Sequence, residues 1–124
     1  MTKLRASDGA TIGTFSVGTS PGALAFDGAN IWVANAGSNS VTKLRAGDGA
    51  TLGTLSVGTS PSGLAFDGSS IWVTNSGSNS VTKLQAVDGA SLGTFSSATN
   101  PAGVAFDGAN IWVAERNNDS ILKL

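Results

Sequence analysis

Six Asp-Gly pairs are the most regularly placed residues in this chain that could take part in chemistry. They recur every 40 residues in two series. Asp-Gly favours tight hairpin turns, whereas carboxylates arranged in a ring could hold calcium. We predict turns, with no metal and no other cofactor, and we keep a calcium ring as the alternative for the second series. The first series is Asp8, Asp48 and Asp88, and the second is Asp27-Gly28, Asp67-Gly68 and Asp107-Gly108.

The three tryptophans follow the same spacing, and each stands between an isoleucine and a valine. An exposed tryptophan could stack on a sugar ring. In the middle of an apolar strand, however, its large ring is better used for packing between sheets. We therefore predict a packing role for Trp32, Trp72 and Trp112.

Only one segment breaks the regular pattern. It is the loop Glu115-Arg116-Asn117-Asn118-Asp119, which places three charges where the other repeats read NAGSN and NSGSN. Loops carry many binding sites, so this segment is a candidate binding site. The alternative interpretation is a solvated loop whose sequence has drifted without gaining a function.

Catalytic groups are scarce. The chain has no histidine and no cysteine, which removes disulfides, thiolate metal ligands and imidazole acid–base chemistry. Serine and threonine are frequent, but they need a neighbouring base to act as nucleophiles. The glycines occur in turns and not before a helix, so there is no phosphate-binding loop. We expect that the protein is not an enzyme.

The overall charge also excludes some partners. Charged residues make up 12% of the chain and the net charge is −1, so no basic surface is expected for nucleic acid. No apolar run approaches the roughly 18 residues of a membrane span, and the first residues do not lead into a signal-peptide core. We expect neither nucleic acid nor membrane as a partner, and the location in the cell stays open. The lysines at 43, 83 and 123, with Arg5 and Arg45, are predicted to be solvated charges on outer strands.

These residues belong to one unit written three times, which makes residues 1–124 a single repeat domain. The units are 1–40, 41–80 and 81–120, and 121–124 begin a fourth. Each unit contains four short segments rich in strand formers and bounded by turn residues. In the second unit we predict strands at 41–46, 52–57, 63–67 and 71–75.

One turn prediction concerns the connection from the fourth strand to the next unit. Gly37 and Gly77 lie there, and the third unit has Asn117. Asparagine is the residue that best replaces glycine in a left-handed conformation. We therefore predict a positive φ at these three positions.

The Ile-Trp-Val strands are apolar on both faces, so they must be covered on both faces. Small four-stranded antiparallel sheets, repeated every 40 residues and covered on both sides, are typical of β-propeller blades. The fold class predicted is all-β, with three blades' worth of strands.

The unit resembles the YVTN-type β-propeller repeat, with NHL and virginiamycin B lyase-like propellers as relatives. The resemblance lies in IWVAN (31–35), NSVTKL (39–44), GTFSVG (13–18) and PGALAFDG (21–28). It implies that strands such as 63–67 line the central axis and that the VGTSP segments step between blades. The lyase relatives depend on a catalytic histidine, which this chain lacks.

Propellers of this kind typically have about four to eight blades, and three blades would leave two apolar faces in water. We predict a homo-oligomer whose copies join head to tail until the ring closes, with six blades as a dimer or nine as a trimer. The chain opens with the first two strands of a unit and closes with residues 121–124, so one blade is expected to be split between copies. Residues 2–4 and 121–124 are candidates for the same strand slot.

The function favoured by these observations is a non-enzymatic structural module that assembles with itself. Near-identical repeats indicate recent amplification or a deliberately regularised sequence, as in a designed scaffold. The alternative is a ligand-binding propeller. Its Ser/Asn/Thr-rich segments 18–20 and 36–40 would share one rim and contact glycans or peptides.

Overall fold

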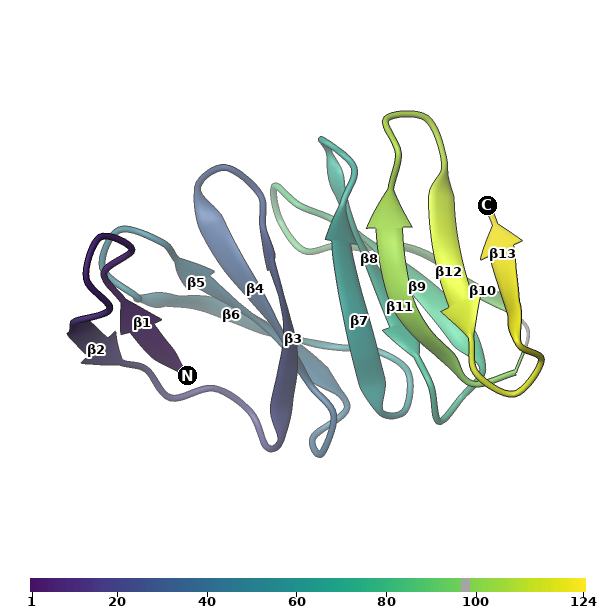
Figure 1. Ribbon diagram of the computed structural model, residues 1–124, viewed down its shortest axis with the longest axis horizontal. Coiled ribbons are helices and arrows are strands. Elements are labelled where there is room, and N and C mark those ends of the chain that lie inside the picture. The colour runs from purple at the N-terminus through teal and green to yellow at the C-terminus, as the bar shows by residue number, and fades with distance from the viewer. Residues whose placement is uncertain (97–98) are drawn as a thin grey trace.

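The computed structural model describes residues 1–96 and 99–124, and every regular element in this part of the chain is a β-strand (Figure 1). No helix that could span a membrane is present among these residues. The strands are β1 (Thr2–Leu4), β2 (Thr11–Thr14), β3 (Pro21–Phe26), β4 (Asn30–Asn35), β5 (Ser40–Arg45), β6 (Thr51–Ser56), β7 (Pro61–Phe66), β8 (Ser70–Asn75), β9 (Ser80–Gln85), β10 (Ser91–Ser96), β11 (Pro101–Phe106), β12 (Ile111–Glu115) and β13 (Ser120–Lys123).

The strands form four antiparallel sheets. Two are complete, with the orders β3-β4-β5-β6 and β7-β8-β9-β10, and two are partial, β1-β2 and β11-β12-β13. Figure 1 shows the partial sheets at opposite ends of the molecule, so the ring is not closed within this chain. The prediction of an all-β chain built from four-stranded antiparallel sheets is confirmed.

The sequence located the strands well. The segments predicted at 41–46, 52–57, 63–67 and 71–75 correspond to β5 to β8, whose bounds differ from them by no more than about two residues. The first strands of the three sheets that follow the β1–β2 hairpin are β3, β7 and β11, and they lie side by side in the middle of the molecule (Figure 1). This is the position that the resemblance implied for the axis-lining strands.

Asp-Gly turns join the first and second strands of each sheet. Between β7 and β8, the Asp67 carboxylate accepts hydrogen bonds from the backbone N–H groups of Ser69 and Ser70 at 2.9 and 2.7 Å. Gly68 follows with a φ of 99°, a value that glycine adopts without strain. Equivalent turns occur at Asp27-Gly28 and Asp107-Gly108.

The prediction of positive φ at Gly37, Gly77 and Asn117 is wrong. The left-handed residue is the one two positions later, namely Asn39, Asn79 or Asp119, with φ between 49° and 52°. Gly37 is small for another reason, because a Cβ there would lie 2.9 Å from Cγ2 of Thr19. The segment between sheets crosses this turn closely, and Asn117 shows that the third repeat accommodates a side chain at the corresponding position.

Candidate functional site

The interface between the two complete sheets shows how these sheets pack. The β3–β6 sheet contributes Trp32, Ala34 and Val41, all fully buried. The β7–β10 sheet contributes Leu64, Ile71, Val73 and Leu84, which are at most 8% exposed. Each sheet therefore has two different faces. We call the face that carries Leu64 and Ile71, and its equivalents, the leading face, and the face that carries Trp32 and Ala34 the trailing face.

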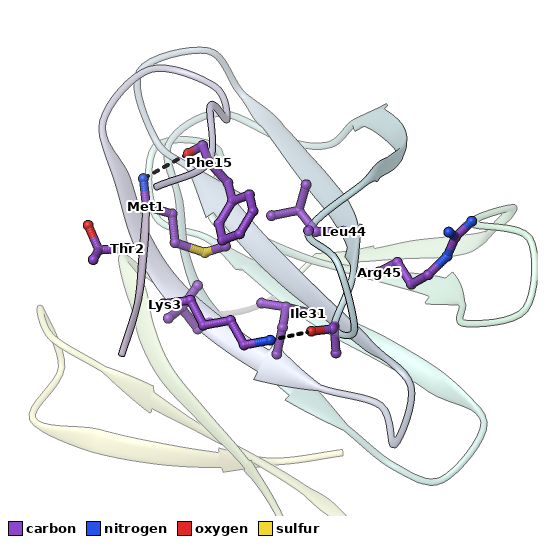
Figure 2. A pocket seen from close by; sticks show the side chains of 10 residues that line it. Met1, Thr2, Lys3, Phe15, Ile31, Leu44 and Arg45 are labelled. Atoms are coloured by element: carbon purple, nitrogen blue, oxygen red, sulfur yellow. Dashed lines mark hydrogen bonds between the residues drawn. The ribbon is translucent and has the colours of Figure 1, made fainter. Parts of the chain in front are cut away.

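The leading face of the β3–β6 sheet is only half covered. Leu24 and Phe26 are both 56% exposed, while Leu64, the equivalent of Leu24 in the next sheet, is 8% exposed. The β1–β2 hairpin covers the outer part of this face, and a largely apolar cavity of about 210 Å³ lies between them. Figure 2 shows Met1 beside the ring of Phe15 in this cavity, with Ile31 and Leu44 on the opposite wall. In the part of the chain that the structure describes, no sheet packs on the inner part of this face, at β3.

The trailing face of the β11–β13 sheet is open as well. Trp112 is 38% exposed and Ile121 is 68% exposed, whereas their equivalents Trp32 and Val41 are fully buried. A shallow depression on this face is lined by Trp112, Ala114, Ile121 and residues 103–105 of β11. The chain thus exposes one leading face and one trailing face, which are the two partners of its own internal interface.

Each tryptophan also makes a hydrogen bond that the sequence reading missed. The indole N–H groups of Trp32, Trp72 and Trp112 donate to the carboxylates of Asp27, Asp67 and Asp107 at 2.8, 2.8 and 2.6 Å. The turn aspartate therefore fixes the orientation of the packing residue five positions later. The constant Asp-Gly-x-x-Ile-Trp spacing was the signal that could have revealed this pair.

These bonds set the acidity of the aspartates. Partial burial raises the pKa of Asp67, but hydrogen bonds from Trp72 and from the backbone of Ser69 and Ser70 outweigh it, so the pKa lies below its ordinary value. The pKa of Asp27 is lowered by the same balance of burial and hydrogen bonds. In Asp107 the hydrogen bond from Trp112 is the largest cause of a strongly lowered pKa. The described residues contain no cluster of three or more potential metal ligands.

The lysine prediction is wrong for Lys43. Its ammonium lies 5.0 Å from the centroid of the Trp32 ring and donates to the carbonyl of Ala86 in the next sheet at 2.7 Å. Lys3 makes the same contact with the carbonyl of Ala46 at 2.9 Å. Lys43 stands on β5, the third strand of its sheet and one strand in from the outer edge, so its side chain reaches across the interface. Arg5 and Arg45 form exposed ion pairs with Asp8 and Asp48.

The candidate binding loop is divided by the structure. Glu115 is the last residue of β12 and is 6% exposed. Its carboxylate accepts a hydrogen bond from Ser120 at 2.7 Å, while its second oxygen has no partner among the described residues. The other four residues are exposed, and Asn117 accepts a bond from Asn100. The structure therefore does not bring residues 115–119 together as one surface site.

The two rim segments do lie together. The backbone N–H of Gly37 donates to Thr19, and that of Thr19 donates to the Ser38 hydroxyl. Beside them a shallow depression is lined mainly by hydroxyl-bearing side chains: Ser16, Ser38, Ser40, Thr42, Thr51, Thr54 and Ser56.

Comparison with known proteins identifies the fold. The chain is similar to hydrazine synthase from Kuenenia stuttgartiensis, with 23% identity and a TM-score of 0.74 over 82% of this chain and 31% of that one. A protein of unknown function from Desulfotomaculum acetoxidans matches at 17% identity and a TM-score of 0.78, over 99% and 47% of the two chains. The computationally designed Ika4 protein matches at 13% identity and a TM-score of 0.73, over 84% and 64%.

The sheets are β-propeller blades. The chain spans about a third to two thirds of the length of the propellers that it matches. No protein-family model matches the sequence. No curated protein matches it either.

Proposed function

We propose that this protein is a non-enzymatic propeller module whose copies join head to tail into a closed ring. The observation that carries the proposal is the pair of open faces. The trailing face at Trp112 and the leading face at Leu24 are the same two surfaces that bury each other between the complete blades. If a second copy follows the first by the same rotation that relates one complete blade to the next, these two surfaces come into contact.

The interface is heterologous, because the two surfaces in contact differ. Such interfaces generate a closed ring when the rotation per copy divides a full turn. Two copies would supply six blades and three copies nine, and both numbers remain in the proposal. The partial sheets β1-β2 and β11-β12-β13 would together form one blade at each interface.

The proposal includes the finer family assignment, a YVTN-type repeat, and a scaffold role. Repeats that differ so little indicate recent amplification or a deliberately regularised sequence, as in a designed scaffold. Burial of each open face would stabilise the assembly by several kcal/mol, because burial of apolar surface contributes on the order of 25 cal/mol per Å². Catalysis is not part of the proposal, because the chain has neither histidine nor cysteine and its lysines stand on strands.

The native mass of the 124-residue chain tests this proposal. We expect a single species of two or three copies. Variants that place a charge on either open face should have the mass of a single copy and should keep the strand content of the folded chain.

A second candidate is binding of glycans or peptides at the rim. It rests on the depression lined by the hydroxyls of Ser16, Ser38, Thr54 and Ser56 and their neighbours. Hydroxyl groups both donate and accept hydrogen bonds, as sugars do. A glycan array and a thermal-shift screen test this candidate. Negative results in both would contradict binding at the rim and favour the scaffold role.

A further inference from the structure

The third strand of the shared blade has two candidates. In β1, residues 2–4 pair with β2, and in β13, residues 120–123 pair with β12. Both segments stand at the repeat position of β5 and β9, and one blade has room for one of them. On the basis of the assembly proposed above, we propose that β1 of one copy takes this position beside β12 of the next copy and displaces β13.

Glu115 is the first observation that favours β1. In the complete blades the equivalent residues, Asn35 and Asn75, donate from their amides to the hydroxyls of Thr42 and Thr82 at 2.9 Å. Leu122 holds the threonine position in β13 and offers no hydroxyl. The buried Glu115 carboxylate is left with Ser120 as its one donor.

Thr2 stands at this threonine position in β1, because it pairs with Thr14 as Thr42 pairs with Thr54. When β1 lies beside β12 of the partner subunit, the Thr2 hydroxyl donates to Glu115 of the partner subunit. Asn35 and Asn75 also leave one side-chain oxygen without a partner, but their amides are neutral. A buried carboxylate with a single hydrogen bond is the more costly case.

The turn after β1 is the second observation. In the complete blades this turn is tied to the Asp-Gly turn of the same blade. The backbone N–H of Ala46 donates to the carbonyl of Ala29, and that of Ala86 donates to Ser69, both at 3.0 Å. Ala109 holds the carbonyl position in the partial blade, and the residue that would donate to it is Ala6, which follows β1.

The lysines provide the third observation. Lys3 and Lys43 each donate to the carbonyl of the corresponding alanine in the next blade, Ala46 and Ala86. Continuing this series, Lys83 would donate to Ala6 of the partner subunit. Placement of β1 therefore supplies three repeated contacts together, through the Thr2 hydroxyl, the Ala6 N–H and the Ala6 carbonyl.

The cost of displacing β13 is small. Its ladder to β12 is replaced by an equivalent ladder from β1. The bonds lost with β13 are the Ser120 bond to Glu115, whose place the Thr2 hydroxyl takes, and the two backbone bonds between Ile111 and Leu124. Ile121 and Leu124 are already 68% and 41% exposed, and only Leu122 packs against the core. Displacing β1 instead would break the hairpin bonds between Arg5 and Ala10 and between Gly9 and Arg5, and also the Lys3 contact.

Cysteine pairs can report which strand is in place, because the chain has no cysteine of its own. Val113 lies opposite Leu122 in β13, and it would lie opposite Thr2 of an incoming β1, as Val33 lies opposite Thr42. Opposite residues in antiparallel strands have Cα atoms about 4.5–5.5 Å apart, which suits a disulfide.

The double variant Thr2→Cys, Val113→Cys should form disulfides between copies under mild oxidation. We expect covalent multimers on a non-reducing gel, and their conversion to single chains by reductant. The matched variant Val113→Cys, Leu122→Cys should close within one chain and hold β13 in place. We expect it to be monomeric when oxidised and to recover the native mass of the assembly when reduced.

Two results would overturn the inference. One is an oxidised Val113→Cys, Leu122→Cys protein that keeps the full mass of the assembly. The other is an assembled Thr2→Cys, Val113→Cys protein without covalent multimers. A monomeric unmodified protein would instead overturn the proposed function, and this inference with it. The milder variant Thr2→Val should raise the dissociation constant of the assembly by about tenfold, while Thr11→Val, an exposed threonine on β2, should not change it.

Discussion

Leu24 and Leu64 occupy the same place in consecutive blades, yet they are 56% and 8% exposed. Trp32 and Trp112 differ in the same way, with exposures of 0% and 38%. The side chains are identical and the local strands are nearly so. What differs is whether another blade lies on the face in question. The internal interface is therefore a template for the contact that the two open faces can make.

A consequence is that equivalent substitutions should have unequal effects on one chain. A buried copy of a residue contributes to folding of the chain. An exposed copy contributes to association.

The tryptophans give the sharpest contrast. Trp32→Ala removes a fully buried ring from the interface between two complete blades and should lower the free energy of unfolding by about 3–5 kcal/mol. Trp112→Ala should cost the isolated chain much less and weaken the assembly instead. Urea unfolding at low protein concentration, together with native mass, separates the two effects. Equal losses of stability in both variants would remove the basis of the comparison.

A charge on an open face is the second test. Leu24→Arg places an unpaired guanidinium where the neighbouring trailing face would lie, and burial of such a charge costs several kcal/mol. We expect the assembly to dissociate into folded monomers in size-exclusion chromatography with light scattering. Val87→Arg is the control, because Val87 is 83% exposed in the turn between β9 and β10. If Leu24→Arg retained the mass of the assembly, the leading face would not be the contact surface.

The Asp–Trp pairs predict a dependence on pH. The folded pKa of Asp67 lies below its ordinary value of 3.8. Its ionised form is therefore favoured by folding, and the stability that it contributes is present above that value and lost as the pH falls through the lower folded pKa. Thermal unfolding should show a melting temperature that falls below about pH 4, and Asp67→Asn should flatten this fall. Asp88→Asn, in an exposed turn, controls for the loss of one charge and should leave the fall in place.

The lysines provide the smallest contrast. Lys43 lies over Trp32 and donates to Ala86 of the next blade, whereas Lys123 lies over Trp112 with no next blade in the chain. Lys43→Met should lower the free energy of unfolding by about 1 kcal/mol. Lys123→Met should change it by less than about half of that. Denaturant titrations of the two variants side by side check this order, and a reversed order would show that the contact across the interface contributes nothing.

The repeat made much of the fold predictable. Period-2 apolar patterns fixed the four strands, and the Asp-Gly pairs fixed the turns, because both depend on residues close together in sequence. The Asp67–Trp72 bond was missed, although the residues are five apart, because a turn role alone was assigned to the aspartate. The left-handed residue was misplaced from Asn79 to Gly77, since the close approach of Thr59 that requires a small residue there comes from a distant segment.

The candidate site was predicted less well, for a physical reason. Residues 115–119 differ in sequence from their counterparts, and this difference was interpreted as a surface feature. The structure instead places Glu115 inside the blade, where its effect depends on which third strand lies beside it. Sequence alone shows that β1 and β13 share a repeat position, but the hydrogen bonds that distinguish them are visible only in the folded structure.

Closure of the ring by several copies is tested by the native mass of the unmodified 124-residue chain at micromolar concentration. We expect one species with the mass of two or three copies, which corresponds to six or nine blades. A species with the mass of a single copy, unchanged as the protein concentration is raised, would contradict it.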